Sequence, residues 1–215
     1  MNHEPIPAVL RRYTDIPGLL HVLTYKALTL LDPSSWDDKN DSYNILKYKE
    51  KDKNLKAVLA LCFTKAEETY HHWRVFAPGP SGVCIVFHGE LLISTLSIHP
   101  GIVCRSVEYH QVRELKRGDL QPKVADLPFV KRFGFGPEEE YRVLYTSGEN
   151  ERAFLQVPIS YDCIKEIRLS PWLNTQLKGC VRDAINNVTR PNVLKVSRSS
   201  LIGNSTWKRF GDRAT

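Results

Sequence analysis

Two short apolar runs constrain the fold of this chain more than any other feature. Residues 57–64 read AVLALCFT, and residues 83–88 read VCIVFH. Neither run alternates apolar with charged side chains, so each fits a strand that is buried on both faces of a sheet. We expect both runs to be central strands, with Cys62 and Cys84 buried and unpaired.

The rest of the chain alternates short apolar runs with turn residues. Asp15 stands where a helix N-cap is expected and Pro17 in the first turn, which predicts a helix over residues 15–26. Residues 45–56 fit either an exposed helix or a mobile loop, because lysine and glutamate dominate them. Other candidate strands are 8–14, 27–33, 101–110, 137–145, 153–158, 162–170 and 192–201, and other candidate helices are 67–77, 89–98, 111–120 and 171–188.

The predicted fold class is α+β. We expect a single domain over residues 1–215, with a mixed, mostly antiparallel sheet of about seven short strands and flanking helices. The hydrophobic fraction of 42% and the charged fraction of 25% are those of an ordinary globular protein. No run approaches the roughly 18 to 20 apolar residues of a membrane span, and the first residues lack the apolar middle of a signal peptide. The 5 cysteines include no C-x-x-C pair, which indicates reduced thiols and a cytoplasmic protein.

The formal net charge of +6 comes largely from the C-terminal part of the chain. We expect residues 181–215 to form a basic segment that packs on the domain or extends from it. Such a segment is either a solvated tail or a contact surface for nucleic acid. Its basic residues are Arg182, Arg190, Lys195, Arg198, Lys208, Arg209 and Arg213, against Asp183 and Asp212.

The common catalytic signatures are absent from the sequence: there is no G-x-x-x-x-G-K-[ST], G-x-G-x-x-G, H-E-x-x-H or G-x-S-x-G. His71 and His72 cannot both bind one metal ion from a helix, because helical neighbours point about 100° apart. We predict no metal site there, and expect one histidine at the surface and the other near Trp73. Tyr70, Trp73 and Phe76 fall at helical spacing, which favours core packing.

Three polar stretches interrupt the apolar pattern and are candidates for a site. Residues 33–41, PSSWDDKND, follow a predicted strand, and residues 9–14, VLRRYT, put two arginines inside the first strand. Residues 137–145, PEEEYRVLY, begin a strand with three consecutive glutamates.

The glutamates need an explanation, because strands disfavour glutamate. In a regular strand Glu138 and Glu140 lie on one face, about 7 Å apart, and Glu139 lies on the other. This face is either a functional site or a solvated strand end whose glutamates pair with Lys131 and Arg132.

The order of these stretches resembles a bacterial family, the domain of unknown function 2971, which is found widely in defence-associated loci. The shared pieces include LRRYT, LCFT, HHWRVFAPGPSGVCIVF, VEY and PEEEYRVLY, and they cover most of the chain before the final basic segment. The E-x-E-Y-R and G-V-C-I-V-F pieces are fairly specific. Two pieces depart from the family pattern: WDDKND stands where F-N-D-P-F is usual, and FGFGP stands where a tryptophan usually precedes the glutamates.

That family is similar in layout to the ADP-ribosyltransferase fold, especially its DarT-like branch. The resemblance implies NAD as the substrate, a protein or nucleic acid as the acceptor, and a role as a toxin or antiphage effector, with an antitoxin as a further partner. Water as the acceptor would make the chain an NAD glycohydrolase. The site residues implied are Arg12, Tyr13, Ser34 and Ser35 for holding NAD, and Glu140 assisted by Glu138 for catalysis.

Two other classes of function remain open on the sequence. A metal-dependent nuclease could use Asp37, Asp38 or Asp41 with the two glutamates around Mg²⁺. A non-catalytic module could bind nucleic acid or a partner through the basic C-terminal segment.

Overall fold

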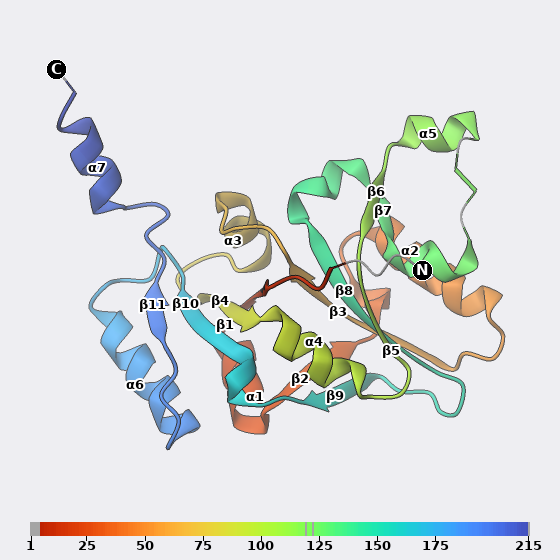
Figure 1. The fold of residues 1–215 in the computed structure, drawn as a ribbon, viewed down its shortest axis with the longest axis horizontal. Coiled ribbons are helices and arrows are strands. Elements are labelled where there is room, and N and C mark those ends of the chain that lie inside the picture. Colours follow the sequence, from red (N-terminus) through yellow and green to blue (C-terminus); the bar gives the residue numbers. More distant parts are fainter. Residues whose placement is uncertain (1–4, 119, 122, 215) are drawn as a thin grey trace.

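The computed structural model of the protein describes residues 5–118, 120–121 and 123–214. Its main feature is a nine-stranded sheet in the order β11-β10-β4-β1-β3-β2-β9, in which β8 also pairs with β3, and β5 with β8 (Figure 1). The strands of this sheet are β1 (Val9–Asp15), β2 (Ala27–Leu31), β3 (Ala57–Thr64), β4 (Gly82–His88), β5 (Ile102–Ser106), β8 (Glu140–Ser147), β9 (Phe154–Pro158), β10 (Ile164–Leu169) and β11 (Val196–Arg198). A small second sheet pairs β6 (Glu108–His110) with β7 (Val130–Arg132).

Helices cover both faces of the large sheet, but the last helix stands away from it (Figure 1). They are α1 (Ile16–Tyr25), α2 (Lys39–Lys51), α3 (Tyr70–Phe76), α4 (Gly89–Ser97), α5 (Val112–Arg117), α6 (Leu177–Thr189) and α7 (Ser205–Gly211). Four 3₁₀ turns complete the elements: η1 (Pro33–Ser35), η2 (Val124–Phe129), η3 (Phe133–Glu138) and η4 (Tyr161–Cys163). No helix among the described residues is both long and apolar enough to cross a membrane.

The α+β class with a mixed, mostly antiparallel sheet is confirmed. Within the described part of the chain, the pairings of the large sheet are antiparallel except that of β10 with β11. The strands are more numerous than expected because the segment 101–110 breaks into β5 and β6, which belong to different sheets, and because residues 130–132 form the unexpected strand β7. The two apolar runs are central strands, as predicted: β3 and β4 are buried along almost their whole length.

Three apolar clusters divide the two faces of the sheet. On one face, alternate residues of β3 and β4 such as Phe63 and Phe87 pack beneath α1, α4 and α6. On the other face, Trp73 of α3 packs against β1 and β4, whereas Ile45 of α2 packs against β3 and β8. The helices α2 and α3 therefore cover different halves of this second face.

The sheet opens between these halves. β3 pairs with β8 along its whole length, but its other edge pairs with β1 only at Arg11–Thr64 and with β2 only at Leu31–Ala60. Between those two points the edge of β3 has no strand partner in the described part of the chain. This opening and the gap between α2 and α3 position the cavity described below.

Several local expectations hold because short-range chemistry decides them. The Asp15 side chain accepts a hydrogen bond from the Gly18 amide at 2.8 Å and caps α1, as predicted. All 5 cysteines are free, and Cys84 is buried, but Cys62 is only half-buried. His71 is exposed and His72 is buried beside Trp73.

Other expectations were wrong where tertiary contacts decide the outcome. The helix expected from residue 171 begins only at Leu177, because the Arg198 guanidinium binds the carbonyls of Pro171 and Leu173 and so removes them from a helical ladder. The helix α2 begins at Lys39, inside the polar stretch, because Asp38 caps it. Trp73 is fully buried, but Tyr70 and Phe76 are largely exposed and do not belong to the core.

Candidate active site

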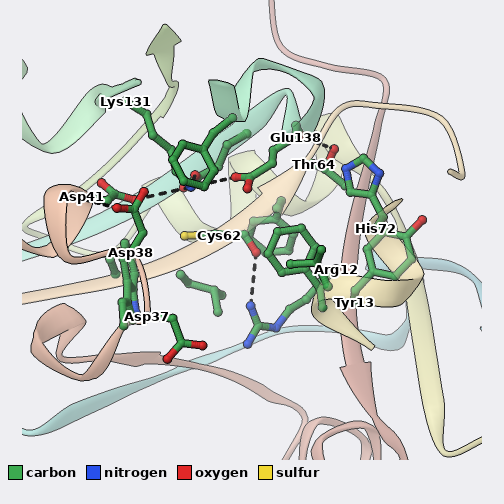
Figure 2. A pocket seen from close by; sticks show the side chains of 18 of the residues that line it. Arg12, Tyr13, Asp37, Asp38, Asp41, Cys62, Thr64, His72, Lys131 and Glu138 are labelled. Atoms are coloured by element: carbon green, nitrogen blue, oxygen red, sulfur yellow. Dashed lines mark hydrogen bonds and ion pairs between the residues drawn. The ribbon is translucent and has the colours of Figure 1, made fainter. Parts of the chain in front are cut away.

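A cavity of about 480 Å³ lies on the second face of the sheet, between α2 and α3. This size is within the usual range for small-molecule sites. Figure 2 shows side chains from β1, β3, α2, α3 and the β7–β8 region meeting around it. Its walls include Arg11, Arg12, Tyr13, Thr29, Trp36, Asp37, Asp38, Asp41, Cys62, Thr64, His72, Lys131, Phe135, Glu138 and Glu140.

Arg142 is fully buried behind one wall of the cavity, where it binds two of the carboxylates that line it. Its Nε donates to Glu140 Oε1 at 2.7 Å, and its Nη1 and Nη2 donate to the two oxygens of Asp41 at 2.9 and 2.6 Å. Nη1 also donates to the carbonyl of Pro128 at 2.6 Å, and the guanidinium lies 5.1 Å from the Trp36 ring centroid. The contacts with Pro128 and Trp36 hold the guanidinium, and its hydrogen bonds to Glu140 and Asp41 fix those two carboxylates in place.

Lys131 joins the same cluster from β7. Its Nζ lies 2.7 Å from Glu138 Oε2, 3.3 Å from Glu140 Oε2 and 3.7 Å from Asp41 Oδ2. When all of these groups are ionised, three carboxylates face the two cations Lys131 and Arg142, so the cluster carries a net charge of −1. We call Asp41, Lys131, Glu138, Glu140 and Arg142 the carboxylate cluster.

The two glutamates of this cluster differ in acidity. Burial disfavours the ionised form of Glu140, but Arg142 and Lys131 together outweigh burial and lower its pKa below the ordinary value. For Glu138 burial is the stronger influence, and it raises the pKa in spite of Lys131. Two neighbouring carboxyl groups with pKa values shifted in opposite directions are suited to different roles, one permanently charged and the other able to exchange a proton.

The backbone that presents the glutamates is a turn and not the regular strand predicted. Glu138 is the last residue of η3, Glu139 adopts a left-handed conformation with φ 41°, and the strand β8 begins only at Glu140. The expected strand face is therefore wrong in its geometry, yet both side chains meet at Lys131. The predicted pairing with Lys131 is present, but it is buried and not a solvated strand end.

Arg12 enters the cavity from β1. Its neighbours Arg11 and Tyr13 lie on the face of the strand that α3 covers, whereas Arg12 reaches through the opening of the sheet. There its Nη1 donates to the Cys62 carbonyl at 3.2 Å, on the unpaired edge of β3 (Figure 2). No carboxylate within the described residues pairs with it, and burial lowers its pKa.

Tyr13 and His72 form a stacked pair at another wall, with ring centroids 5.4 Å apart. Thr69 Oγ1 accepts from the His72 amide at 3.2 Å and lies 2.6 Å from His72 Nδ1. His72 Nδ1 and the Thr69 hydroxyl therefore share one hydrogen bond, whose direction depends on the tautomer of the ring. Burial lowers the pKa of His72, in keeping with a neutral ring.

Ser34 differs from the other predicted residues in its position. Ser34 is exposed in η1, where its amide donates to Asp32 Oδ1, and it is not among the residues that line the cavity. The side chain of Ser35 lies outside the described part of the structure.

The sequence analysis missed or misread four residues around the cavity: Asp41, His72, Lys131 and Arg142. Glu140 and Arg142 are two apart on a strand and so share a face, a signal that the E-Y-R motif contains. Nothing local connects Asp41 with Arg142, because 101 residues separate them. Lys131 was named only as a surface partner, and His72 only as a packed residue.

Two of the three aspartates suggested for a nuclease site have other partners, and the third is exposed. Both oxygens of Asp41 accept from Arg142, Asp38 Oδ1 caps α2, and Asp37 is exposed. Across the described ranges, no three histidine, cysteine, aspartate or glutamate side chains come together in a way that could hold a metal ion.

Comparisons with known proteins give a likeness of fold only. No family model matches the sequence, and no curated protein is significantly similar to it, so the resemblance to the domain family 2971 is not confirmed. Solved structures of Thermus sp. 2.9 DarT are similar at 11% identity. The complex with ADP-ribosylated ssDNA has a TM-score of 0.47 and covers 90% of this chain and 94% of that chain. The complex with NAD⁺ has a TM-score of 0.45 and covers 91% of this chain and 96% of that chain. The complex with carba-NAD⁺ has a TM-score of 0.46 and covers 91% of this chain and 97% of that chain. At this level the likeness carries no residue's role to the present chain.

Proposed function

We propose that the chain binds NAD in the cavity and is an ADP-ribosyltransferase-like enzyme. The observation that carries this proposal is the distribution of charge around one cavity. Arg12 supplies a cation without a carboxylate partner in the described part of the chain, and the carboxylate cluster supplies a net charge of −1 when all of its groups are ionised. NAD has the complementary pair of charges, an anionic pyrophosphate and a cationic nicotinamide ring.

Arg12 would bind the pyrophosphate. A guanidinium offers a planar fork of donors that stays charged at all physiological pH values. Within the described residues its one hydrogen bond to the protein goes to the Cys62 carbonyl, which leaves other N–H groups available for phosphate oxygens. The Tyr13 ring, which lines the same cavity, offers an apolar surface beside this group.

Glu140 would stabilise the transition state of NAD cleavage. When the bond between nicotinamide and the ribose C1′ breaks, its electron pair leaves with nicotinamide, and the ribose gains oxocarbenium character. The lowered pKa of Glu140 keeps a negative charge beside that cation. Each of its carboxylate oxygens has a second lone pair, so it can accept from a ribose hydroxyl while Arg142 and Lys131 hold it.

Glu138 would act on the group that attacks C1′. A carboxylate of raised pKa is a better base than an ordinary one, and burial provides that shift here. In the transfer step the nucleophile forms its bond to C1′ and passes its proton to Glu138. If water is the nucleophile, the products are ADP-ribose and nicotinamide, and the enzyme is an NAD glycohydrolase.

The acceptor we favour is a nucleic acid, because of the C-terminal helix α7. In Figure 1 α7 stands away from the sheet, and its aromatic residues Trp207 and Phe210 are 76% and 73% exposed. Lys208 and Arg209 lie beside them on the same short helix. Exposed aromatic rings and unburied cations are the combination that binds single strands by stacking and by phosphate contacts. Such an activity would make the chain a toxin or antiphage effector, whose host would need an antitoxin.

The test is to incubate the purified protein with NAD and to follow free nicotinamide by chromatography. Radiolabelled NAD with added single-stranded DNA, RNA or protein then identifies the acceptor. Release of nicotinamide that depends on Glu140 supports the proposal, and a folded protein that leaves NAD intact contradicts it. Magnesium-dependent strand cutting would favour the nuclease instead, and salt-sensitive binding without either reaction would favour the binding module.

A further inference from the structure

Thr64 occupies the point where three strands of the sheet meet. It is the last residue of β3, where it pairs with Arg11 of β1 on one side and with Glu140 of β8 on the other. Its pairing with Arg11 is the one register position that joins β1 to β3 in the described part of the chain. Thr64 is 6% exposed and lines the cavity (Figure 2).

The Thr64 hydroxyl has a fixed orientation. Its oxygen accepts from the Ala66 amide at 3.0 Å, and its proton is donated to the carbonyl of Glu138 at 2.5 Å. The next residue continues the same contact, because the Lys65 amide donates to the Glu139 carbonyl at 3.0 Å. The turn 138–140 is thus docked onto the end of β3 by a side-chain hydroxyl, a main-chain amide and a strand pair.

These contacts hold the turn against two unfavourable features, the left-handed backbone at Glu139 and the burial of the Glu138 carboxylate. Glu139 holds a left-handed backbone that side-chain-bearing residues rarely adopt, and it must be maintained by contacts outside the turn. Glu138 is 7% exposed, although burial disfavours its ionised form. Without an anchor on its main chain, the turn can relax and carry the Glu138 carboxylate toward water.

We propose that Thr64 is a positioning residue, which acts through the main chain to hold the Glu138 carboxylate in the cavity. Its link to catalysis rests on the proposed function, but its effect on Glu138 does not. Thr64 contacts the carbonyl of Glu138 and not its carboxylate, so it sets the place of the base without taking part in proton transfer.

The test compares Thr64→Val, which keeps the branched shape and deletes the hydroxyl, with Thr64→Ser, which keeps the hydroxyl. The first measurement is the pKa of Glu138, taken from the ¹³C shift of its carboxyl carbon during a pH titration. We expect Thr64→Val to move this pKa down toward its ordinary value, because the side chain gains access to water. Thr64→Ser should stay at the wild-type value.

The second measurement is NAD cleavage as a function of pH. In Thr64→Val we expect kcat to fall about tenfold with KM for NAD unchanged within about twofold, and the acid limb of the profile to shift to lower pH. In Thr64→Ser, kcat and the pH profile should match those of wild type. If no protein variant cleaves NAD, the proposed function fails, while the titration still decides the role of Thr64.

Three results would overturn the assignment. The first is an unchanged pKa of Glu138 in Thr64→Val. The second is a change of the Glu138 pKa in Thr64→Ser that is as large as in Thr64→Val, and the third is a failure to fold. If Thr64→Val does not fold, Thr64→Ala removes the same donor with a smaller side chain and replaces it in both measurements. Failure of both to fold would make the hydroxyl a requirement of folding and would refute a specific positioning role.

Discussion

Arg142 of β8 and Asp41 of α2 are joined by two parallel hydrogen bonds, 2.9 and 2.6 Å long, although 101 residues separate them in the sequence. Their side chains are 0% and 2% exposed. The pair fastens α2 to the sheet at the edge of the cavity. It also keeps Arg142 in place for Glu140, so the fold and the site depend on the same guanidinium.

Breaking this pair should destabilise the protein strongly. Asp41→Asn leaves Arg142 with one compensating carboxylate in place of two, and removing one partner of a buried ion pair costs about 3–5 kcal/mol. We expect a loss of that order in the free energy of unfolding, measured by urea denaturation. Asp37→Asn is the matched control, because Asp37 is exposed, and it should change the value by less than about 0.5 kcal/mol. Equal stability of the two variants would show that the pair contributes little.

The catalytic assignment predicts different effects for three neighbouring glutamates. Glu140→Gln keeps the size of the side chain and deletes its charge, so the rate of NAD cleavage should fall about 100-fold or more. Glu138→Gln should reduce transfer to the acceptor more than hydrolysis of NAD. Glu139→Gln is the control, because Glu139 is exposed, and both activities should remain near wild type. Toxicity in cells should disappear with Glu140→Gln, and equal activity of all three variants would refute the assignment.

The opposite pKa shifts of Glu138 and Glu140 predict opposite effects of pH on stability. The pKa of Glu140 is lowered on folding, so its ionisation stabilises the fold above its usual pKa near 4.5, and this contribution is lost as pH falls through the lowered value. The pKa of Glu138 is raised, so its contribution is present at low pH and is lost as pH rises above 4.5.

Urea denaturation across this range therefore has a clear expected outcome. The stability of wild type relative to Glu140→Gln should decrease on acidification, whereas that relative to Glu138→Gln should increase. Parallel trends in the two variants would mean that the two carboxyl groups share one environment.

Removing the C-terminal helix should weaken nucleic-acid binding without unfolding the domain. Truncation after Ser200 deletes Lys208, Arg209 and Arg213, and each lost phosphate contact to a single strand should reduce the log–log salt slope of binding by about 0.7. The midpoint of thermal unfolding should stay at the full-length value. Every residue beyond Ser200 that the structure describes is exposed, and the buried Ser199 is retained. An unchanged slope would remove α7 from the binding surface.

The cysteines should react with a thiol reagent in a defined order. Burial raises the pKa of Cys84 to about 12 and that of Cys104 to about 11, so both are protonated at neutral pH. Cys180 is exposed on α6 and should supply the fast phase of labelling by a disulfide reagent. Cys180→Ser should abolish that phase, and rapid labelling of Cys84 in the folded protein would contradict the packing of β4.

The sequence predicts those parts of the fold that neighbouring residues decide. The apolar pattern identifies β3 and β4, and the Asp15 cap identifies the start of α1, because burial and capping act over a few residues. The turn at Glu139 is different. A positive φ at a glutamate has no local signature, so a regular strand was the natural prediction and Glu138 was placed wrongly.

The residues around the cavity were predicted only in part, because contacts between distant parts of the chain place some of them. Arg12, Tyr13, Glu138 and Glu140 do line one cavity, and each carries a polar or charged group that an apolar strand would not need. The contact between Asp41 and Arg142 depends on how α2 crosses the sheet, and the position of Ser34 depends on a turn that Asp32 controls. Neither can be read from spacing along the chain.

The hydrogen bond from Arg12 to Cys62 ends on a main-chain carbonyl. Every amino acid has that carbonyl, so no substitution at position 62 can delete the acceptor, although the Cys62 side chain itself lines the cavity. The shape and polarity of the cavity can therefore diverge at this position during evolution, while the arginine keeps its anchor.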